Sequence, residues 1–192
     1  MIRALIFDCF GVFYSDPVFA YMRDPKTSKD KAEALHNLDD QASHGKLTKA
    51  DFVKQAAQIL GDSHSAVEQR FFHGDIDKAL VAFVIQARKQ YKTALLSNIG
   101  GDMMDGFFNQ DEYDQLFDTV VLSGMVELAK PNPEIFSLVC EKLGVSLNEA
   151  LMIDDMQENI DIAKSLGIQG ICYRDFEQFK LEFEALSAKT ML

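Results

Sequence analysis

Short apolar runs alternate with helical stretches along most of this chain. Five runs stand out, at residues 2–7, 93–96, 119–122, 151–153 and 170–173. The stretches between them carry helix signals: Pro133 begins one that ends at Leu143-Gly144, and the stretch 155–166 ends at Gly167. Because strands separated by helices pair in parallel, the alternation predicts an α/β fold, a Rossmann-like parallel sheet with helices on its faces.

A long interruption separates the first two runs. About 80 residues lie between them, far more than a crossover connection needs. Their pattern is helical: an apolar stripe passes through Leu35 and Leu38, and Thr48 with Asp51 begins a second helix that Gly61 ends. The sequence therefore predicts a core domain of residues 1–14 and 85–192 with an inserted α-helical cap of residues 15–84. Such a cap would lie over the end of the first strand and select substrate there.

The chain is acidic, with a formal net charge of −11 over 192 residues. It has no basic stripe, which argues against a nucleic-acid partner. No run reaches the roughly 20 apolar residues of a membrane span, and no signal-peptide pattern precedes the first strand. Cys9, Cys140 and Cys172 have neither disulfide nor metal-ligand spacing. We therefore expect a cytoplasmic protein without nucleic-acid or membrane partners, whose oligomeric state the sequence does not indicate.

Polar residues that can carry chemistry stand near the carboxyl ends of four predicted strands. They are Asp8, Ser97 with Asn98, Lys130, and Asp154-Asp155 with Asn159. A strand-end carboxylate can act as a nucleophile, and hydroxyl and amide groups can hydrogen-bond a phosphoryl oxygen. A lysine can balance negative charge, and paired acids can bind a hard cation. Taken singly, each group also has an ordinary explanation as loop chemistry or helix capping.

Taken together and in order, these residues resemble the motifs of the haloacid dehalogenase-like hydrolase superfamily. Its motifs follow the order nucleophilic Asp, Ser or Thr, Lys, and acidic pair. The resemblance covers essentially the whole chain, including the stretch 130–136 and a helical cap of the C1 type found in subfamily I. It implies an aspartyl-phosphate on Asp8 in phosphatase members, and Mg²⁺ as the cofactor.

The resemblance also implies a role for each residue. Asp8 and Lys130 would be catalytic, and Ser97, Asn98 and Lys130 would bind phosphate. Magnesium would be bound by Asp8, Asp155 and the backbone carbonyl of Phe10, with Asp154 and Asn159 supporting the site. The charges agree with this assignment, because three crowded carboxylates would repel one another unless a cation and Lys130 joined them.

Phe10 departs from the phosphatase pattern. Phosphatases of this superfamily usually have Asp two positions after the nucleophile, where it protonates the leaving group and later activates water. Phe retains the backbone carbonyl and loses the acid. General acid–base catalysis contributes about 10² to 10⁴ in rate, so a loss of that order is expected unless another group substitutes. Tyr14, Asp16 and His44 are candidates for such a substitute.

The departure leaves three hypotheses. We expect a Mg²⁺-dependent phosphatase of a small phosphorylated metabolite, resembling sugar-1-phosphate phosphatases and the amino-terminal phosphatase domain of epoxide hydrolases. The first alternative is a 2-haloacid dehalogenase, because an aromatic residue at position 10 resembles that branch. Against it stand Asp154-Asp155 and Val12, where dehalogenases differ. The second alternative is a phosphate-binding regulatory protein with impaired catalysis.

Overall fold

A five-stranded parallel sheet forms the centre of the molecule in a computed structural model that describes residues 1–189. The strand order is β3-β2-β1-β4-β5, and each pair of neighbours is parallel. The strands are β1 (Ala4–Phe7), β2 (Lys92–Ser97), β3 (Thr119–Leu122), β4 (Ala150–Asp154) and β5 (Gln169–Cys172). All five predicted runs are therefore strands, which confirms the predicted α/β fold class.

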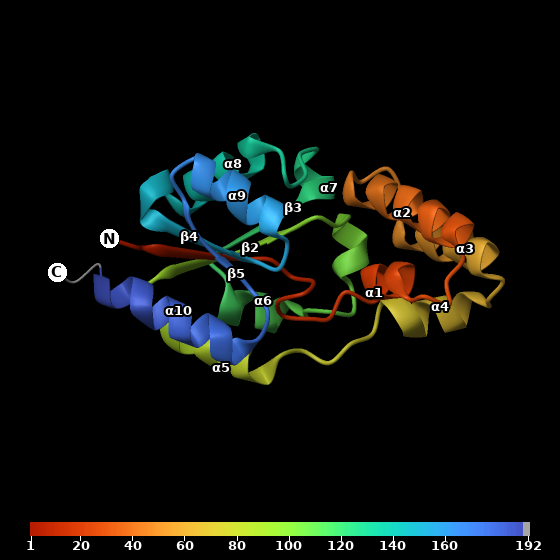
Figure 1. Ribbon diagram of the computed structural model, residues 1–192, viewed down its shortest axis with the longest axis horizontal. Helices are drawn as coiled ribbons and strands as arrows, with labels where there is room; N and C mark the ends of the chain where they lie inside the picture. Colours follow the sequence, from red (N-terminus) through yellow and green to blue (C-terminus); the bar gives the residue numbers. More distant parts are fainter. Residues whose placement is uncertain (190–192) are drawn as a thin grey trace.

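Helices cover both faces of the sheet (Figure 1). Successive residues of β1 point to opposite faces: Leu5 and Phe7 belong to one buried cluster, Ala4 and Ile6 to the other. The first cluster includes residues of α5 (Lys78–Ala87), α6 (Gln110–Leu116) and α10 (Phe176–Lys189), and the second those of α8 (Pro133–Leu143) and α9 (Gln157–Ser165). Shorter helical turns complete the core, namely Gly101–Met104, α7 (Ser123–Val126) and Leu147–Glu149.

Four helices form a separate group at one end of the molecule, to the right in Figure 1. They are α1 (Pro17–Arg23), α2 (Lys29–Ser43), α3 (Lys49–Leu60) and α4 (His64–Phe71). The predicted signals of α3 are confirmed, since the Thr48 side chain accepts a hydrogen bond from the Asp51 amide and Gly61 ends the helix at a φ of 76°. We call these four helices the cap. The exact division at residues 14/15 and 84/85 stays a prediction.

The chain leaves the cap through α5, which packs on the core (Figure 1). The Phe83 ring meets the rings of Phe179 and Phe183 edge to face, with centroids 4.9 and 5.1 Å apart. This contact joins α5 to α10 on the same face of the sheet. Within the described residues, no helix is both long and apolar enough to span a membrane.

One helix begins later than the sequence predicts. The stretch 155–166 is expected to be helical from its first residue, whereas α9 begins at Gln157. The Asp154 side chain accepts a hydrogen bond of 2.9 Å from the Met156 amide, which bends the chain into a short turn before the helix. This turn determines where the Asp155 carboxylate lies.

Candidate active site

Asp8 lies immediately after β1, at the edge of the sheet that faces the cap. Its amide donates to the Ile153 carbonyl at 2.9 Å, which extends the pairing of β1 with β4 by one residue. The Asp8 Oδ1 accepts a hydrogen bond of 2.7 Å from the Cys9 amide. Because parallel strands end at the same edge, Asp8 and the last residue of β4, Asp154, are brought together.

Lys130 connects these two carboxylates. Its Nζ lies 2.8 Å from Asp8 Oδ1 and 2.7 Å from Asp154 Oδ2, and the residue is only 5% exposed. Asn98, the residue after β2, positions Lys130: the Asn98 Oδ1 accepts from the Lys130 amide at 2.8 Å, and the Asn98 Nδ2 donates to the Lys130 carbonyl at 2.7 Å. The Asn98 side-chain amide thus holds the backbone of Lys130 in place. The predicted contact of Asn98 with phosphate stays a prediction.

The acidic pair at the end of β4 divides into two environments. Asp154 is fully buried and accepts hydrogen bonds from Lys130 and from Asn159 Nδ2, the latter at 2.9 and 3.1 Å. Asp155 is half-buried and lines the cleft. Gly11, at a φ of +78°, passes so close that a Cβ built on it would lie 2.3 Å from Asp155 Cγ. Asp154 is therefore the supporting member of the pair, and Asp155 is the carboxylate available to a ligand.

The electrostatics of this cluster favour a divalent cation. One oxygen each from Asp8, Asp154 and Asp155 lie within 4.8 Å of one another. Within residues 1–189 the one cation that forms an ion pair with this cluster is Lys130, which pairs with Asp8 and Asp154. With all three carboxylates ionised, one ammonium would leave two negative charges unbalanced. Burial raises the pKa of Asp8 to about 8, and burial and the Asp154 carboxylate raise that of Asp155 to about 6. Magnesium, which binds hard oxygen ligands, fits this donor set.

Ser97 provides a second sign of a ligand-binding site. It ends β2, is 1% exposed, and lines the same cleft as Asp8 and Lys130. Its Oγ has no hydrogen-bond partner among the described residues. A buried hydroxyl without a partner is costly, so a polar ligand atom is expected beside it. The cleft that contains these groups has a cavity volume of about 280 Å³.

Comparison with known proteins identifies the family. A model of the family described as haloacid dehalogenase-like hydrolase matches residues 16–172. This chain is a haloacid dehalogenase-like hydrolase. It is 27% identical over 187 residues to a D-ribitol-5-phosphate phosphatase of Bacteroides thetaiotaomicron, an alignment that covers 88% of this chain and 90% of the relative.

Other members of the family show how diverse its chemistry is. The chain is 24% identical over 190 residues to (S)-2-haloacid dehalogenase 4A of Burkholderia cepacia, covering 88% of this chain and 82% of the relative. The fold matches a crystal structure of a HAD family enzyme from Bacteroides thetaiotaomicron, solved in complex with magnesium and inorganic phosphate. The TM-score is 0.71 at 24% identity, covering 89% of this chain and 93% of that one.

Phe10 lies at the boundary of the cleft of this hydrolase. Its ring meets the Phe107 ring edge to face with centroids 4.9 Å apart. Of the candidate substitutes for the missing acid, the Tyr14 hydroxyl donates to the Phe107 carbonyl, and the His44 Nδ1 lies 2.8 Å from the Asp40 carbonyl oxygen. Asp16 caps α1 and lines the cleft. Asp16 and His44 therefore border the site, and the buried Tyr14 hydroxyl is engaged in the loop.

Two residues of this region were missed in the sequence. Asp39 lies on cap helix α2 and lines the cleft, and Phe107 lies in an irregular stretch between β2 and α6. Asp39 stands beside Asp40 in an ordinary helical pattern, and the stretch around Phe107 has no periodicity. Neither position carries a local signal, because Asp39 reaches the site through packing of the cap against the core, and Phe107 through contact of its loop with the Phe10 ring.

Replacing Lys130 by Met should destabilise the protein strongly. The Asp8 and Asp154 carboxylates would remain buried without their shared ammonium partner. We expect the free energy of unfolding to fall by about 3–5 kcal/mol, measured by urea denaturation at pH 7 without divalent cations. The exposed Lys54→Met should change it by less than about 0.5 kcal/mol. The double variant Lys130→Met/Asp154→Asn should recover part of the lost free energy of unfolding. If Lys130→Met were as stable as the wild type, the buried ion pairs of Lys130 would not stabilise the fold.

Proposed function

We propose that this hydrolase is a Mg²⁺-dependent phosphatase of a small phosphorylated metabolite, acting through an aspartyl-phosphate on Asp8. The observation that carries the proposal is the buried Ser97 hydroxyl, which has no partner and lines one cleft with Asp8 and Lys130. A phosphoryl oxygen would satisfy this hydroxyl. The naming of a similar protein as a D-ribitol-5-phosphate phosphatase supports the same chemistry.

In this proposal each residue has a separate task. An Asp8 oxygen attacks phosphorus, the bond from phosphorus to the ester oxygen breaks, and the departing alkoxide takes a proton from solvent water to become the alcohol. Lys130 Nζ, which lies 2.8 Å from Asp8 Oδ1, balances the charge of nucleophile and phosphate, and Ser97 Oγ donates to a phosphoryl oxygen. Water then hydrolyses the aspartyl-phosphate, which releases inorganic phosphate and restores the Asp8 carboxylate.

Magnesium would be held by Asp8, Asp155 and the Phe10 carbonyl. When bound, it would neutralise negative charge on the nucleophile and the phosphoryl group. Asp154 and Asn159 would hold Lys130 and the end of β4 in place beside it, through the hydrogen bonds already described. Because burial raises the pKa of the Asp8 carboxyl, a cation here would also favour the ionised, nucleophilic form.

The proposal predicts how rate depends on the leaving group. Without an acid at position 10, departure should slow steeply as the leaving alcohol becomes more basic. We expect p-nitrophenyl phosphate to be hydrolysed faster than an unsubstituted alkyl phosphate by about 10² or more, measured as kcat/KM with Mg²⁺ at pH 7. Both rates should vanish with excess EDTA and return with added Mg²⁺. Equal rates along an aryl-to-alkyl series would refute the inference about the missing acid, and hydrolysis unaffected by EDTA would refute the metal requirement.

Dehalogenation is the second candidate, favoured by Phe10 and by the similarity to a haloacid dehalogenase. The same cleft could place Asp8 against carbon instead of phosphorus. The Asp155 carboxylate argues against this use, because it faces Asp8 and Asp154 with no cationic partner of its own among the residues described. Metal-independent chloride release from 2-chloropropionate would establish the alternative and would replace the phosphatase proposal.

A further inference from the structure

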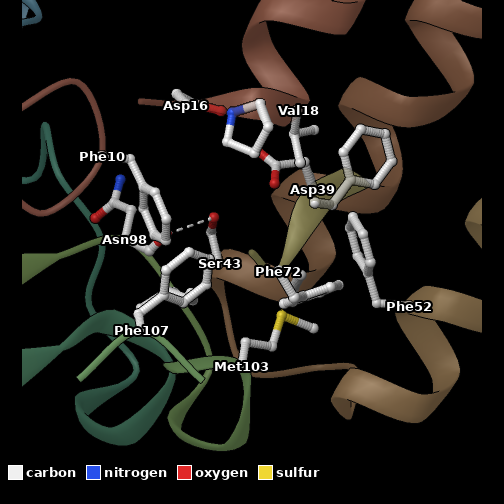
Figure 2. A pocket seen from close by; sticks show the side chains of 14 residues that line it. Phe10, Asp16, Val18, Asp39, Ser43, Phe52, Phe72, Asn98, Met103 and Phe107 are labelled. Atoms are coloured by element: carbon white, nitrogen blue, oxygen red, sulfur yellow. Dashed lines mark hydrogen bonds between the residues drawn. The ribbon is translucent and has the colours of Figure 1, made fainter. Parts of the chain in front are cut away.

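A second cavity adjoins the catalytic cleft on the side of the cap (Figure 2). Its volume is about 70 Å³, and five of its residues also line the cleft: Phe10, Asp16, Asp39, Ser43 and Asn98. The Ser43 hydroxyl of α2 donates to the Asn98 carbonyl at 3.2 Å, so cap and core meet at the shared wall. The part of a small substrate farthest from its phosphate would therefore enter this cavity, which we call the distal cavity.

Aromatic rings form much of the wall of the distal cavity. Figure 2 shows Phe10 and Phe107 on one side and Phe52 and Phe72 on the other. The Phe52 and Phe72 rings meet edge to face with centroids 5.7 Å apart, and Phe72 and Phe107 lie 6.4 Å apart. The face of an aromatic ring carries partial negative charge and attracts a cation within about 6 Å of its centre.

The charged groups of the distal cavity are both acids. Of its 14 lining residues, Asp16 and Asp39 carry charge, and none is Lys, Arg or His. The Asp16 carboxylate is engaged, accepting from the Phe19 amide at 2.8 Å. The Asp39 carboxylate has no hydrogen bond or ion pair within residues 1–189. Burial raises the pKa of Asp39 to about 7, and the Asp16 and Asp40 carboxylates add to this effect. Asp39 therefore lacks a partner that a cation would supply.

We propose that the distal cavity binds an organic ammonium group, and that the substrates are phosphate monoesters of amino alcohols such as choline phosphate. This inference rests on the proposed phosphatase function. An anionic end would meet two carboxylates and no cation among the lining residues, and an alkyl end would cover the half-buried Asp39 carboxylate without giving it a partner. The small volume suits a compact head group and excludes a long chain.

An ammonium group would also ease the reaction at a site that lacks an acid at position 10. In an amino alcohol the positive charge stands two carbons from the ester oxygen and withdraws electron density from it. The departing alkoxide is therefore less basic than that of an unsubstituted alcohol and needs less help from a proton donor. Phe10 thus agrees with the proposal in two ways: its ring lines the cavity where the cation would bind, and its position carries no acid.

The test compares choline with its neutral isostere, 3,3-dimethylbutan-1-ol, in which carbon replaces the charged nitrogen. Binding is measured by calorimetry to the full chain in the presence of Mg²⁺ and inorganic phosphate, with ribitol as a third ligand. We expect choline to bind at least about tenfold more tightly than the isostere. Among substrates, choline phosphate should exceed 3,3-dimethylbutyl phosphate in kcat/KM by a similar factor or more. Equal binding of the two alcohols, or tighter binding of ribitol than of choline, would overturn the proposal.

Asp39→Asn tests which group recognises the charge. It keeps the size of the side chain and should reduce the preference for choline over the isostere to about threefold or less. The matched control is Glu33→Gln, an exposed position on the same helix that lines neither cavity, which should keep the wild-type ratio. An unchanged ratio in Asp39→Asn would overturn the role of Asp39. If that variant does not fold, the comparison of the two alcohols on the wild-type protein still decides whether the distal cavity prefers an ammonium group.

Hydrolysis of p-nitrophenyl phosphate separates the two proposals, because this substrate carries no ammonium group. Its hydrolysis with Mg²⁺, together with equal binding of choline and the isostere, would overturn the ammonium site and leave the phosphatase. A clear preference for choline without hydrolysis of any phosphate ester would support the ammonium site and refute the phosphatase.

Discussion

Asp8→Asn should abolish phosphatase turnover while the protein stays folded. Asparagine has nearly the same shape but cannot form the acyl phosphate, so kcat for p-nitrophenyl phosphate should fall by about 10⁴-fold or more. The amide oxygen can still accept the hydrogen bond that the Cys9 amide donates to Asp8 Oδ1, so the loop after β1 should keep its conformation. The measurement is steady-state hydrolysis with saturating Mg²⁺, together with urea unfolding of the same preparation.

The control for this change is Asp161→Asn, the same substitution at an exposed position of α9. It should leave kcat within about twofold of the wild type, since surface substitutions have small effects. Retention of a tenth or more of the activity in Asp8→Asn would mean that Asp8 is not the nucleophile. A variant that loses both activity and cooperative unfolding would instead assign Asp8 a structural role through its ion pair with Lys130.

Phe10→Asp should increase the hydrolysis of unactivated alkyl phosphates by about 10² to 10⁴ in kcat/KM, the usual contribution of a general acid. The new carboxyl would stand at the boundary of the cleft that Phe10 lines together with Asp8, Asp16 and Asp155. The change loses the edge-to-face contact with Phe107, worth about 0.5–1.5 kcal/mol, so the variant should be slightly less stable. Aryl phosphates, whose leaving groups need little protonation, should gain far less.

Phe10→Asn is the matched control, because it removes the ring and supplies no proton. A gain seen with Asp and not with Asn would assign the effect to acid–base catalysis. Equal gains would mean that the ring merely hinders substrate entry. If neither variant gains, another group already supplies the proton, and Asp16 and Asp39 are the cleft residues to replace next. A wild-type protein without turnover that becomes active as Phe10→Asp would support the hypothesis of impaired catalysis.

Much of the core follows from local patterns in the sequence. All five apolar runs are strands, and the signals at Thr48, Gly61, Pro133 and Gly144 mark real helix ends. The meeting of Asp8 with Asp154 also follows, because parallel strands bring their carboxyl ends to one edge whatever lies between them in sequence. Local periodicity and edge geometry were therefore enough to group Asp8 with the acidic pair.

The details of that group depend on side-chain partners. The sequence places Asn98 with the phosphate ligands, and in the structure its amide makes both of its hydrogen bonds to the Lys130 backbone. The different environments of Asp154 and Asp155 likewise depend on Asn159 and on the close approach of Gly11. Such partners are chosen by distances of an ångström or less, which residue spacing does not encode.

The sequence by itself determined which polar residues gather near Asp8, and the tertiary structure decided which residues face them across the cleft. Asp39 comes from the cap, Phe107 from an irregular loop, and Phe10 from the turn after β1, yet all three line the distal cavity. Phe10 and Phe107 meet within the core, and packing of the cap brings Asp39 to them. These are contacts between segments far apart in the chain, and they leave no periodic trace in any of them. The fold class and the candidate nucleophile could therefore be predicted from local patterns, and the chemistry of the substrate's far end could not.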